Sequence, residues 1–236
     1  MMPPLERATG YALLGRAFAY PDPEVLVVEL QALAGGPPAL ARLAAALAPH
    51  LELGGGGSWA LEGEYNRLFA TGVAVSPYET AYLRDDPGLR LGRLAALYEA
   101  FGARAGGPAR ERPDHIGTEL EFAALLCLKE ALFAERAAGP EPAPEAARAL
   151  AEIRRARRLF AEEHLGRWAS TFAARLAAAT EQPFWRVLAA ELARWVERDL
   201  QEHRWQPLPA PALPLEPAEP LVVPLHCPHA PPPPAP

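Results

Sequence analysis

Apolar residues recur at helical spacing along almost the whole of this 236-residue chain, and breaks rich in proline or glycine divide the pattern into segments of helix length. Half of the residues are apolar, with alanine and leucine dominating, whereas runs of the strand-favouring valine, isoleucine and threonine are scarce. A chain of this length can bury a substantial core. The sequence therefore predicts an all-α protein, a single-domain helical bundle.

The breaks separate about nine helical segments. We expect helices at about residues 5–19, 23–34, 39–51, 58–69, 87–101, 113–137, 145–163, 167–180 and 183–203. Ser58 is the expected N-cap of the fourth helix, because a serine side chain can accept from the free amides of a first turn. Residues 71–86 have no helical period and contain Pro77, which predicts a long ordered loop of the kind that often carries function.

The character of the chain changes after Trp205. Residues 207–236 are dense in proline, which is excluded from helix interiors and central strands. We expect a helical domain over residues 1–205 and a proline-rich, disordered or polyproline tail over residues 206–236. The tail holds three soft or borderline metal ligands, His226, Cys227 and His229, but one short cluster on such a tail does not close a tetrahedral site.

The net charge of −6 argues against a nucleic-acid partner, which usually requires a basic face, and mildly against anionic membrane surfaces. No apolar run approaches the roughly 18–20 residues of a membrane span, and no secretory signal is visible. We expect a cytoplasmic protein without stable membrane insertion. Cys127, flanked by leucines, is expected to be a buried apolar thiol rather than part of a disulfide framework.

The sequence lacks the motifs of the common catalytic sites. No histidine has a glutamate three residues before it, as a di-iron helical bundle needs. There is no Gly-x-Ser-x-Gly, no Walker loop and no dinucleotide fingerprint, and Cys127 has no polarising neighbour. We therefore expect no enzyme activity, no cofactor and no metal.

The most unusual stretch is residues 111–121, which combines a proline, a histidine and four acidic residues at the start of the long sixth helix. Pro113 suits a first helical turn, and Asp114 is expected beside the free amides at the positive end of the helix dipole. His115 and Glu119 are four residues apart and share a helix face. Two interpretations stay open: an elaborate helix cap, or a site that binds a ligand or transfers protons.

A second candidate lies before the long loop. Tyr65, Leu68 and Phe69 stand at helical spacing, as core residues or as one wall of a site, and the chain then runs into the loop with Tyr78 and Glu79. An aromatic helix end, a tyrosine-bearing loop and an acidic helix start can together wall a groove. Such a groove suits a peptide with an apolar stretch and positive charge.

Taken in order, these motifs resemble the TorD/DmsD/NarJ family of cytoplasmic maturation chaperones for molybdenum-containing redox enzymes. The resemblance rests on Glu64-Tyr65-x2-Leu68-Phe69, on Ser76-Pro77-Tyr78-Glu79 and on Glu111-x-Pro113-Asp114-His115-x3-Glu119-Leu120-Glu121-Phe122, with further support from residues 163–172 and 183–185. It covers about residues 5–205, and the proline tail has no assigned counterpart. It implies an all-helical domain with no catalytic chemistry of its own.

The resemblance also implies a partner. Family members bind the twin-arginine leader or the apo form of a molybdopterin-containing oxidoreductase, and hold this precursor until its cofactor is inserted and it is exported. Some members serve cytoplasmic-facing subunits such as that of nitrate reductase, and some form homodimers. Carried over residue by residue, it assigns peptide binding to the following positions: Tyr65, Leu68, Phe69, Ser76, Pro77, Tyr78, Glu79, Asp114, His115, Glu119 and Glu121.

The chemistry of these residues is compatible with that role. Carboxylates such as Glu79, Asp114 and Glu119 can pair with guanidinium groups, and the aromatic helix end can shelter an apolar segment. An alternative is a helical scaffold that docks on a mature redox complex and has no signal-peptide groove. A third class, a nucleotide or small-ligand binder, lacks a phosphate loop. A leader-binding chaperone binds the isolated leader, whereas a scaffold needs the folded partner.

Overall fold

The computed structural model describes residues 1–51, 55–71, 73–84, 86–105, 111–139 and 144–209. Within these ranges it contains nine α-helices and no β-strand, which confirms the all-α prediction. The helices are α1 (Pro4–Ala17), α2 (Pro23–Leu33), α3 (Pro38–Leu47), α4 (Gly55–Tyr65), α5 (Pro87–Ala100), α6 (Ile116–Ala138), α7 (Pro144–Glu163), α8 (Leu165–Ala179) and α9 (Pro183–His203). Three short turns, η1 (Ala48–His50), the π-helical η2 (Asn66–Ala70) and η3 (Glu79–Ala81), complete the elements.

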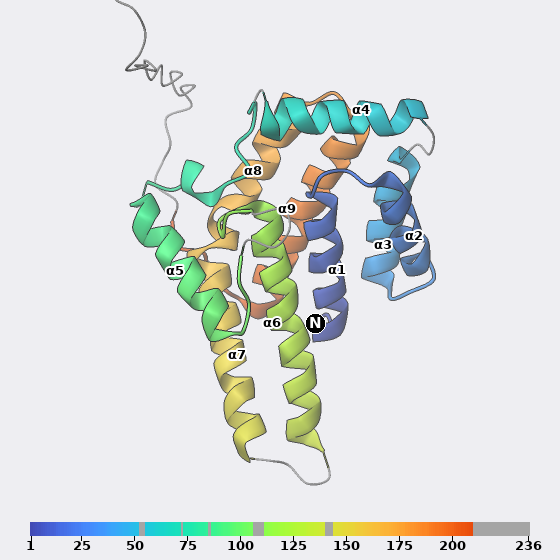
Figure 1. Ribbon diagram of the computed structural model, residues 1–236. Coiled ribbons are helices and arrows are strands. Elements are labelled where there is room, and N and C mark those ends of the chain that lie inside the picture. The colour runs from blue at the N-terminus through green and yellow to red at the C-terminus, as the bar shows by residue number, and fades with distance from the viewer. Residues whose placement is uncertain (52–54, 72, 85, 106–110, 140–143, 210–236) are drawn as a thin grey trace, which may run out of the picture.

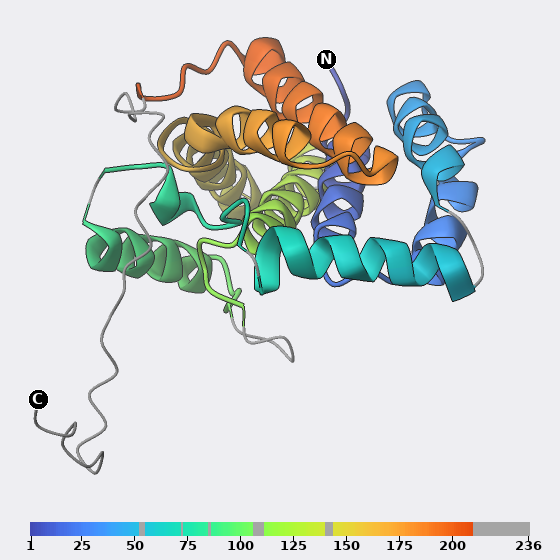
Figure 2. The ribbon, with the colours of Figure 1, turned by 90° about the horizontal axis from the view of Figure 1, so that it is seen from above.

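Helices α1 and α6 lie side by side in the middle of the molecule, and α8 and α9 pack against each other beside them (Figure 1). Helix α6 also pairs with α7, and the far ends of these two project beyond the rest of the bundle (Figure 1). Helix α4 runs crosswise over one end of the bundle, as the view from above also shows (Figure 2). That end is where the loop after α4 meets the start of α6.

Several helix starts follow from local sequence. Asp22 and Asp86 cap α2 and α5, where their carboxylates accept from the amides of Val25 (3.1 Å) and Leu89 (2.7 Å). A proline at the first turn supports both, because its missing N–H needs no partner there. Helix α4 begins at Gly55, so the expected cap at Ser58 was wrong and this residue lies inside the helix.

The start of α6 also differs from the expectation. The helix begins at Ile116, with His115 as its N-cap, so Pro113 and Asp114 precede it and do not form its first turn. Their carbonyl oxygens explain why. Pro113 O accepts from the Tyr98 hydroxyl (2.7 Å), and Asp114 O accepts from the amide of Glu79 (2.9 Å), so neither carbonyl is available to a helical turn.

Cys127 lies in the core beneath α1 and α9, as expected, and burial raises the pKa of its thiol to about 12. The core around it is made of large apolar side chains from α1, α6, α8 and α9, among them Trp168, Phe172, Trp185 and Leu188. Among the described residues no helix is long and apolar enough to span a membrane. The tail residues His226, Cys227 and His229, for which no metal site was expected, lie outside the described residues.

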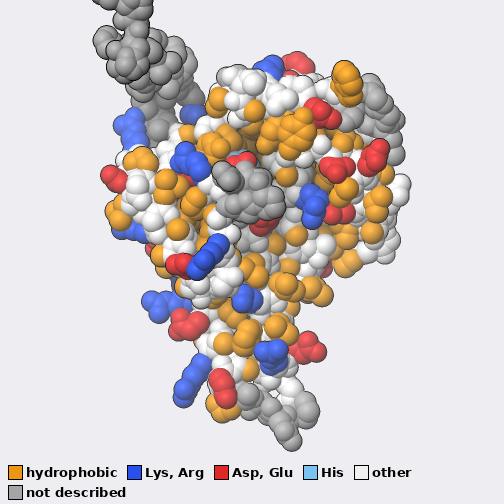
Figure 3. Space-filling model, viewed as in Figure 1, with side chains coloured by type: hydrophobic (Ala, Val, Ile, Leu, Met, Phe, Trp, Pro, Cys, Tyr) orange, Lys and Arg blue, Asp and Glu red, His pale blue; other side chains and the backbone are white. Residues whose placement is uncertain are grey.

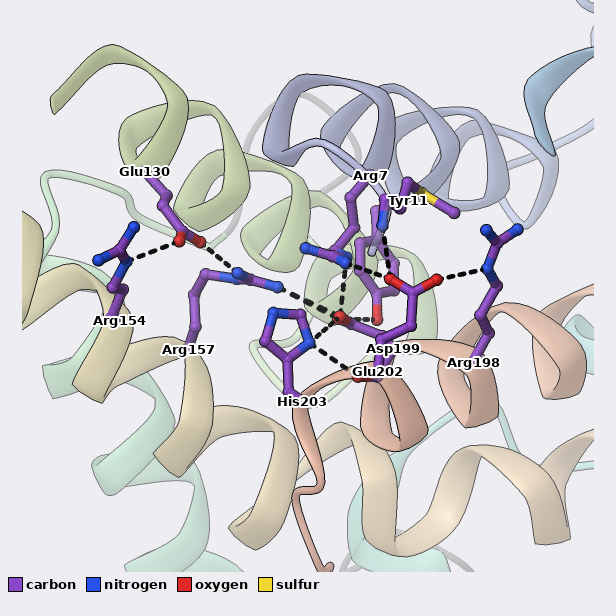
Figure 4. A network of polar contacts seen from close by, with 10 residues as sticks. Arg7, Tyr11, Glu130, Arg154, Arg157, Arg198, Asp199, Glu202 and His203 are labelled. Carbon is purple, nitrogen blue, oxygen red and sulfur yellow. Dashed lines mark hydrogen bonds and ion pairs between the residues drawn. The ribbon is translucent and has the colours of Figure 1, made fainter. Parts of the chain in front are cut away.

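A buried ion network ties four helices together (Figure 4). At its centre, the Asp199 carboxylate of α9 pairs with Arg7 of α1 (2.8 Å) and Arg157 of α7 (3.3 Å), and accepts from the Tyr11 hydroxyl (2.8 Å). Arg157 also pairs with Glu130 of α6. Because buried charges are tolerated only when paired, this network fixes how α1, α6, α7 and α9 pack.

Gly10 sets the distance between α1 and α9. A Cβ atom at this position would lie 1.9 Å from Cζ2 of Trp195, so any side chain must displace the buried Trp195 ring or push the helices apart. We expect Gly10→Ala to lower the free energy of unfolding by about 1–3 kcal/mol, as overpacking does. Urea unfolding followed by circular dichroism measures this change.

Gly92→Ala is the matched control, because a Cβ at this position of α5 has nothing within 4 Å. That substitution is expected to leave stability unchanged or to raise it by up to about 1 kcal/mol, since alanine favours helix. Equal effects of the two substitutions would contradict a close crossing of α1 and α9.

Candidate functional site

Two sequence motifs meet where the loop after α4 runs along the start of α6. The amide of Ile116 donates to Pro77 O (2.9 Å), and the amide of Glu79 donates to Asp114 O (2.9 Å), so that Tyr78 and His115 form an isolated antiparallel bridge. We call residues 76–80 and 111–119 the loop–helix junction. Pro77 and Glu79, in the loop expected at residues 71–86, are therefore held by backbone hydrogen bonds to the charge-dense segment.

Asp114 is the buried anchor of the junction. Its side chain is 0% exposed, and both carboxylate oxygens have partners within the chain. Oδ1 accepts from Nε of Arg112 (3.0 Å), while Oδ2 accepts from Nη2 of Arg112 (3.0 Å) and from the hydroxyl of Thr80 (2.7 Å). The loop and the helix start are thus joined by side chains as well as by backbone.

Glu79 lies deeper and links the junction to two more elements. Its carboxylate, also 0% exposed, pairs with Nη1 of Arg90 on α5 (2.8 Å). Nδ1 of His164, between α7 and α8, lies 3.2 Å from both carboxylate oxygens. This carboxylate therefore holds the loop against α5 and the α7–α8 connection.

Glu119 is buried without an adjacent cation at hydrogen-bond distance. Oε2 accepts from the indole N–H of Trp168 (3.1 Å), and Oε1 has no hydrogen-bond partner among the described residues. Burial, and then the negative charge of Glu79, raise the pKa of this carboxyl well above its usual range. The neutral, protonated form is favoured at this position.

His115 serves as a helix cap. Nδ1 accepts from the amide of Gly117 (3.1 Å), which requires that this nitrogen carry no proton. Burial lowers the pKa of the imidazole, although the charges of Glu111 and Asp114 oppose the shift. The ring of His115 caps the helix, whereas the expected capping residue Asp114 is paired with Arg112 and Thr80, so the geometry gives no support to an acid–base pair.

The aromatic helix end is divided between core and surface. Leu68 is fully buried and Phe69 packs against Trp185 at 5.5 Å between ring centroids, as the core interpretation predicted. Tyr65 is half-buried and lies edge-on to the exposed ring of Tyr20 (5.3 Å). Burial raises the pKa of Tyr65 to about 12, with smaller contributions from the charges of Glu111 and Tyr78. Tyr65 therefore lies within electrostatic range of Glu111 and Tyr78 in the junction.

The solvent-facing part of the junction is aromatic and charged. Arg112, whose side chain is 45% exposed, lies with Cζ 4.5 Å from the centroid of the half-buried Tyr78 ring. Ser76 and Glu111 are also partly exposed. Figure 3 shows apolar side chains gathered on this face below α4, between scattered charges. Buried carboxylates thus form a floor beneath a partly aromatic surface.

One candidate residue lies apart from the junction. Glu121 is exposed on α6, where its Cγ lies beside Gly15 of α1. The partners that sequence analysis missed are Thr80, Arg90, Arg112, His164 and Trp168. Arg112, His164 and Trp168 lie within the stretches on which the resemblance rests, and the sequence signal for Arg112 is a cation two residues before Asp114.

A separate open recess lies on the other side of the α4 end. It has a volume of about 520 Å³ and is bordered by the 78%-exposed ring of Trp59, by Glu64 and Arg67, and by residues before α9. Glu64 pairs with Arg67 (2.6 Å) and accepts from the hydroxyl of Thr180. The described residues contain no group of three or more histidine, cysteine or acidic side chains that could hold a metal ion.

The chain is similar to two proteins that are named as assembly chaperones. The chain is 39% identical over 123 residues to a selenate reductase assembly chaperone protein of Thauera selenatis, covering 50% of this chain and 58% of that protein. It is 31% identical over 180 residues to a chlorate reductase assembly chaperone protein of Ideonella dechloratans, covering 74% of this chain and 79% of that protein. These relatives are named as assembly chaperones and not as enzymes, which confirms the expectation of a non-enzyme.

The chain also matches a protein-family model. Residues 34–174, which include the whole junction, match the model of the nitrate reductase delta subunit family. The chain belongs to this family, and the resemblance to the TorD/DmsD/NarJ chaperones of molybdoenzyme maturation is confirmed.

The two buried glutamates of the junction are expected to respond oppositely to an amide substitution. Glu79→Gln leaves Arg90 without its counter-charge, and removing one partner of a buried ion pair costs about 3–5 kcal/mol of stability. Glu119→Gln keeps an oxygen acceptor for Trp168 and removes a carboxyl whose ionised form is disfavoured by burial. We therefore expect it to stabilise the protein at neutral pH.

The effect of Glu119→Gln on the free energy of unfolding is expected to depend on pH. A carboxyl whose pKa is higher in the folded than in the unfolded chain contributes stability below its unfolded pKa, and this stability is lost as pH rises through the folded pKa. The gain in the free energy of unfolding from Glu119→Gln should therefore become smaller as the pH falls. Urea unfolding measured from neutral to acidic pH tests this. Destabilisation by Glu119→Gln at neutral pH would show that the carboxylate is ionised and paired.

Proposed function

We propose that this chain is the assembly chaperone of a molybdopterin-containing oxidoreductase. In this proposal it binds the apo catalytic subunit, through a twin-arginine leader where the subunit has one. It holds this precursor in the cytoplasm until the cofactor is inserted and the protein is exported. The family and the two relatives support the partner class, since these relatives are named for selenate and chlorate reductase. The client's own substrate stays open.

One observation carries the leader-binding part of the proposal: half-buried aromatic rings reach solvent at the junction above a rigid, internally paired floor. Tyr65 and Tyr78 offer apolar ring faces whose positions are already fixed, so little conformational entropy is lost on binding. Glu111 beside them and the net charge of −6 suit a cationic, apolar segment.

The candidate residues then divide by role. Tyr65, Ser76 and Tyr78 contact the leader. The buried members of the set, namely Leu68, Phe69, Pro77, Glu79, Asp114, His115 and Glu119, shape the surface and keep it rigid. Glu121, on the side of α1, extends the acidic surface along α6.

A second candidate function keeps the fold and changes the target. A scaffold that docks on a mature redox complex needs a broad exposed surface, and the recess beside Trp59 offers one. The two functions differ in what they bind, because a leader-binding chaperone recognises the isolated peptide and a scaffold recognises the folded complex.

The test uses a leader peptide from the oxidoreductase that co-purifies with the chain. We expect Tyr65→Ala and Tyr78→Ala each to weaken binding of this peptide about tenfold, equivalent to about 1.4 kcal/mol, because each removes one aromatic contact. Fluorescence anisotropy of the labelled peptide measures the affinity, and unchanged helical circular dichroism controls for folding.

Trp59→Ala is the matched control, since it removes an exposed aromatic ring from the recess and leaves the junction intact. Loss of affinity in Trp59→Ala, with none in the tyrosine variants, would move the binding site to the recess. Binding of the mature complex without binding of the leader would favour the scaffold.

A further inference from the structure

Arg112 is held at the junction in the way that proteins hold a bound arginine ligand. Nε and Nη2 of its guanidinium donate to the two oxygens of the Asp114 carboxylate, each at 3.0 Å. Nη2 also donates to the hydroxyl of Thr80 (3.1 Å), and the guanidinium carbon lies 4.5 Å from the centroid of the Tyr78 ring. A guanidinium group is recognised in proteins by bidentate pairing with a carboxylate, by further hydrogen-bond acceptors and by contact with an aromatic face. Asp114, Thr80 and Tyr78 supply these three features.

This arginine differs from the structural arginines of the bundle. Arg7, Arg90 and Arg157 are 2–5% exposed and hold buried carboxylates inside the fold. The Arg112 side chain is 45% exposed, while its partner Asp114 is 0% exposed. The guanidinium therefore lies between a buried anion and the solvent.

The backbone of Arg112 is anchored independently of its side chain. Its carbonyl oxygen accepts from the amide of His115 (3.2 Å), a bond that does not involve the guanidinium. The side chain can consequently leave the carboxylate by rotation about its own bonds while the junction keeps its backbone hydrogen bonds.

We propose that Asp114, Thr80 and Tyr78 form an arginine-binding site that Arg112 fills in cis, and that an arginine of the client leader takes its place. This inference rests on the proposed function, since it names the group of the leader that the junction recognises. The leader guanidinium pairs with Asp114 in place of Arg112, so the buried carboxylate has a counter-ion in both the free and the client-bound chaperone. Lysine cannot substitute, because an ammonium group does not form the two-pronged pair.

The fraction of molecules in which Arg112 occupies the arginine site also sets the apparent affinity for the client leader. A leader can enter only the fraction of molecules in which Arg112 has left, so its apparent affinity is lowered by that fraction. The chaperone can then release its client by returning Arg112 to the site.

The first experiment is chemical rescue of Arg112→Ala without any client. We expect this variant to melt at a lower temperature than the wild type, because Asp114 loses its counter-ion. Millimolar ethylguanidinium should restore part of the loss and should shift the Thr80 amide signal in the NMR spectrum. Ethylammonium should do neither, and the wild type should respond to neither compound.

A matched control is Arg104→Ala, which removes an 84%-exposed arginine whose partner Glu99 is itself exposed. This variant should show no guanidinium-specific rescue. Rescue of Arg112→Ala by ethylammonium as effective as that by ethylguanidinium, or the absence of rescue by either, would overturn the proposed arginine site.

The second experiment compares leader peptides that carry two consecutive arginines or two lysines. The arginine peptide should bind Arg112→Ala about tenfold more tightly than the wild type, whereas the lysine peptide should bind both proteins equally and weakly. Equal affinity of the arginine peptide for both proteins would overturn the exchange.

The two proposals fail in different ways. If ethylguanidinium rescues the variant but neither protein binds the leader, the arginine site stands and leader binding is wrong. If the leader binds both proteins equally and no rescue occurs, leader binding stands and the arginine site is wrong.

Discussion

The buried carboxylate of Asp114 is the constraint on which the junction depends. A charge inside a protein must be paired, and in the free chain Arg112 and Thr80 supply the partners of this one. That requirement joins the loop to the start of α6, and the same alignment brings the amide of Glu79 to Asp114 O. Glu79 in turn reaches Arg90 and His164, so one loop position fixes contacts to α5 and to the α7–α8 connection.

This architecture suits binding better than chemistry. Most polar groups of the junction have partners within the chain: Asp114 pairs with Arg112, Glu79 pairs with Arg90, and His115 accepts from the amide of Gly117. What remains for a partner is a rigid surface of half-buried rings, flanked by charges. An assembly chaperone needs such a surface, because it must hold an unfinished protein and then let it go. Exchange at Arg112 offers a means of release that leaves the buried floor undisturbed.

The sequence was sufficient to predict most of the fold, because the helical period is strong and proline or aspartate marks several helix starts. It also placed Cys127 in the core and gave the core as one of two interpretations of Leu68 and Phe69. It was wrong about the start of α6, since the carbonyl of Asp114 is taken by the amide of Glu79, a contact between distant segments. For the same reason the burial of the candidate carboxylates was not foreseen. Their partners Arg90, His164 and Trp168 come from α5, the α7–α8 connection and α8, and no local pattern pairs them.

The central claim is that a client leader binds over the loop–helix junction. Hydrogen–deuterium exchange of the full chain, with and without the leader peptide of its co-purifying oxidoreductase, tests this claim most directly. We predict that the leader slows exchange of the amides in residues 76–80 and 111–116 and leaves those of α2 and α3 unchanged. Protection confined to the recess around Trp59, with no change at the junction, would contradict the account.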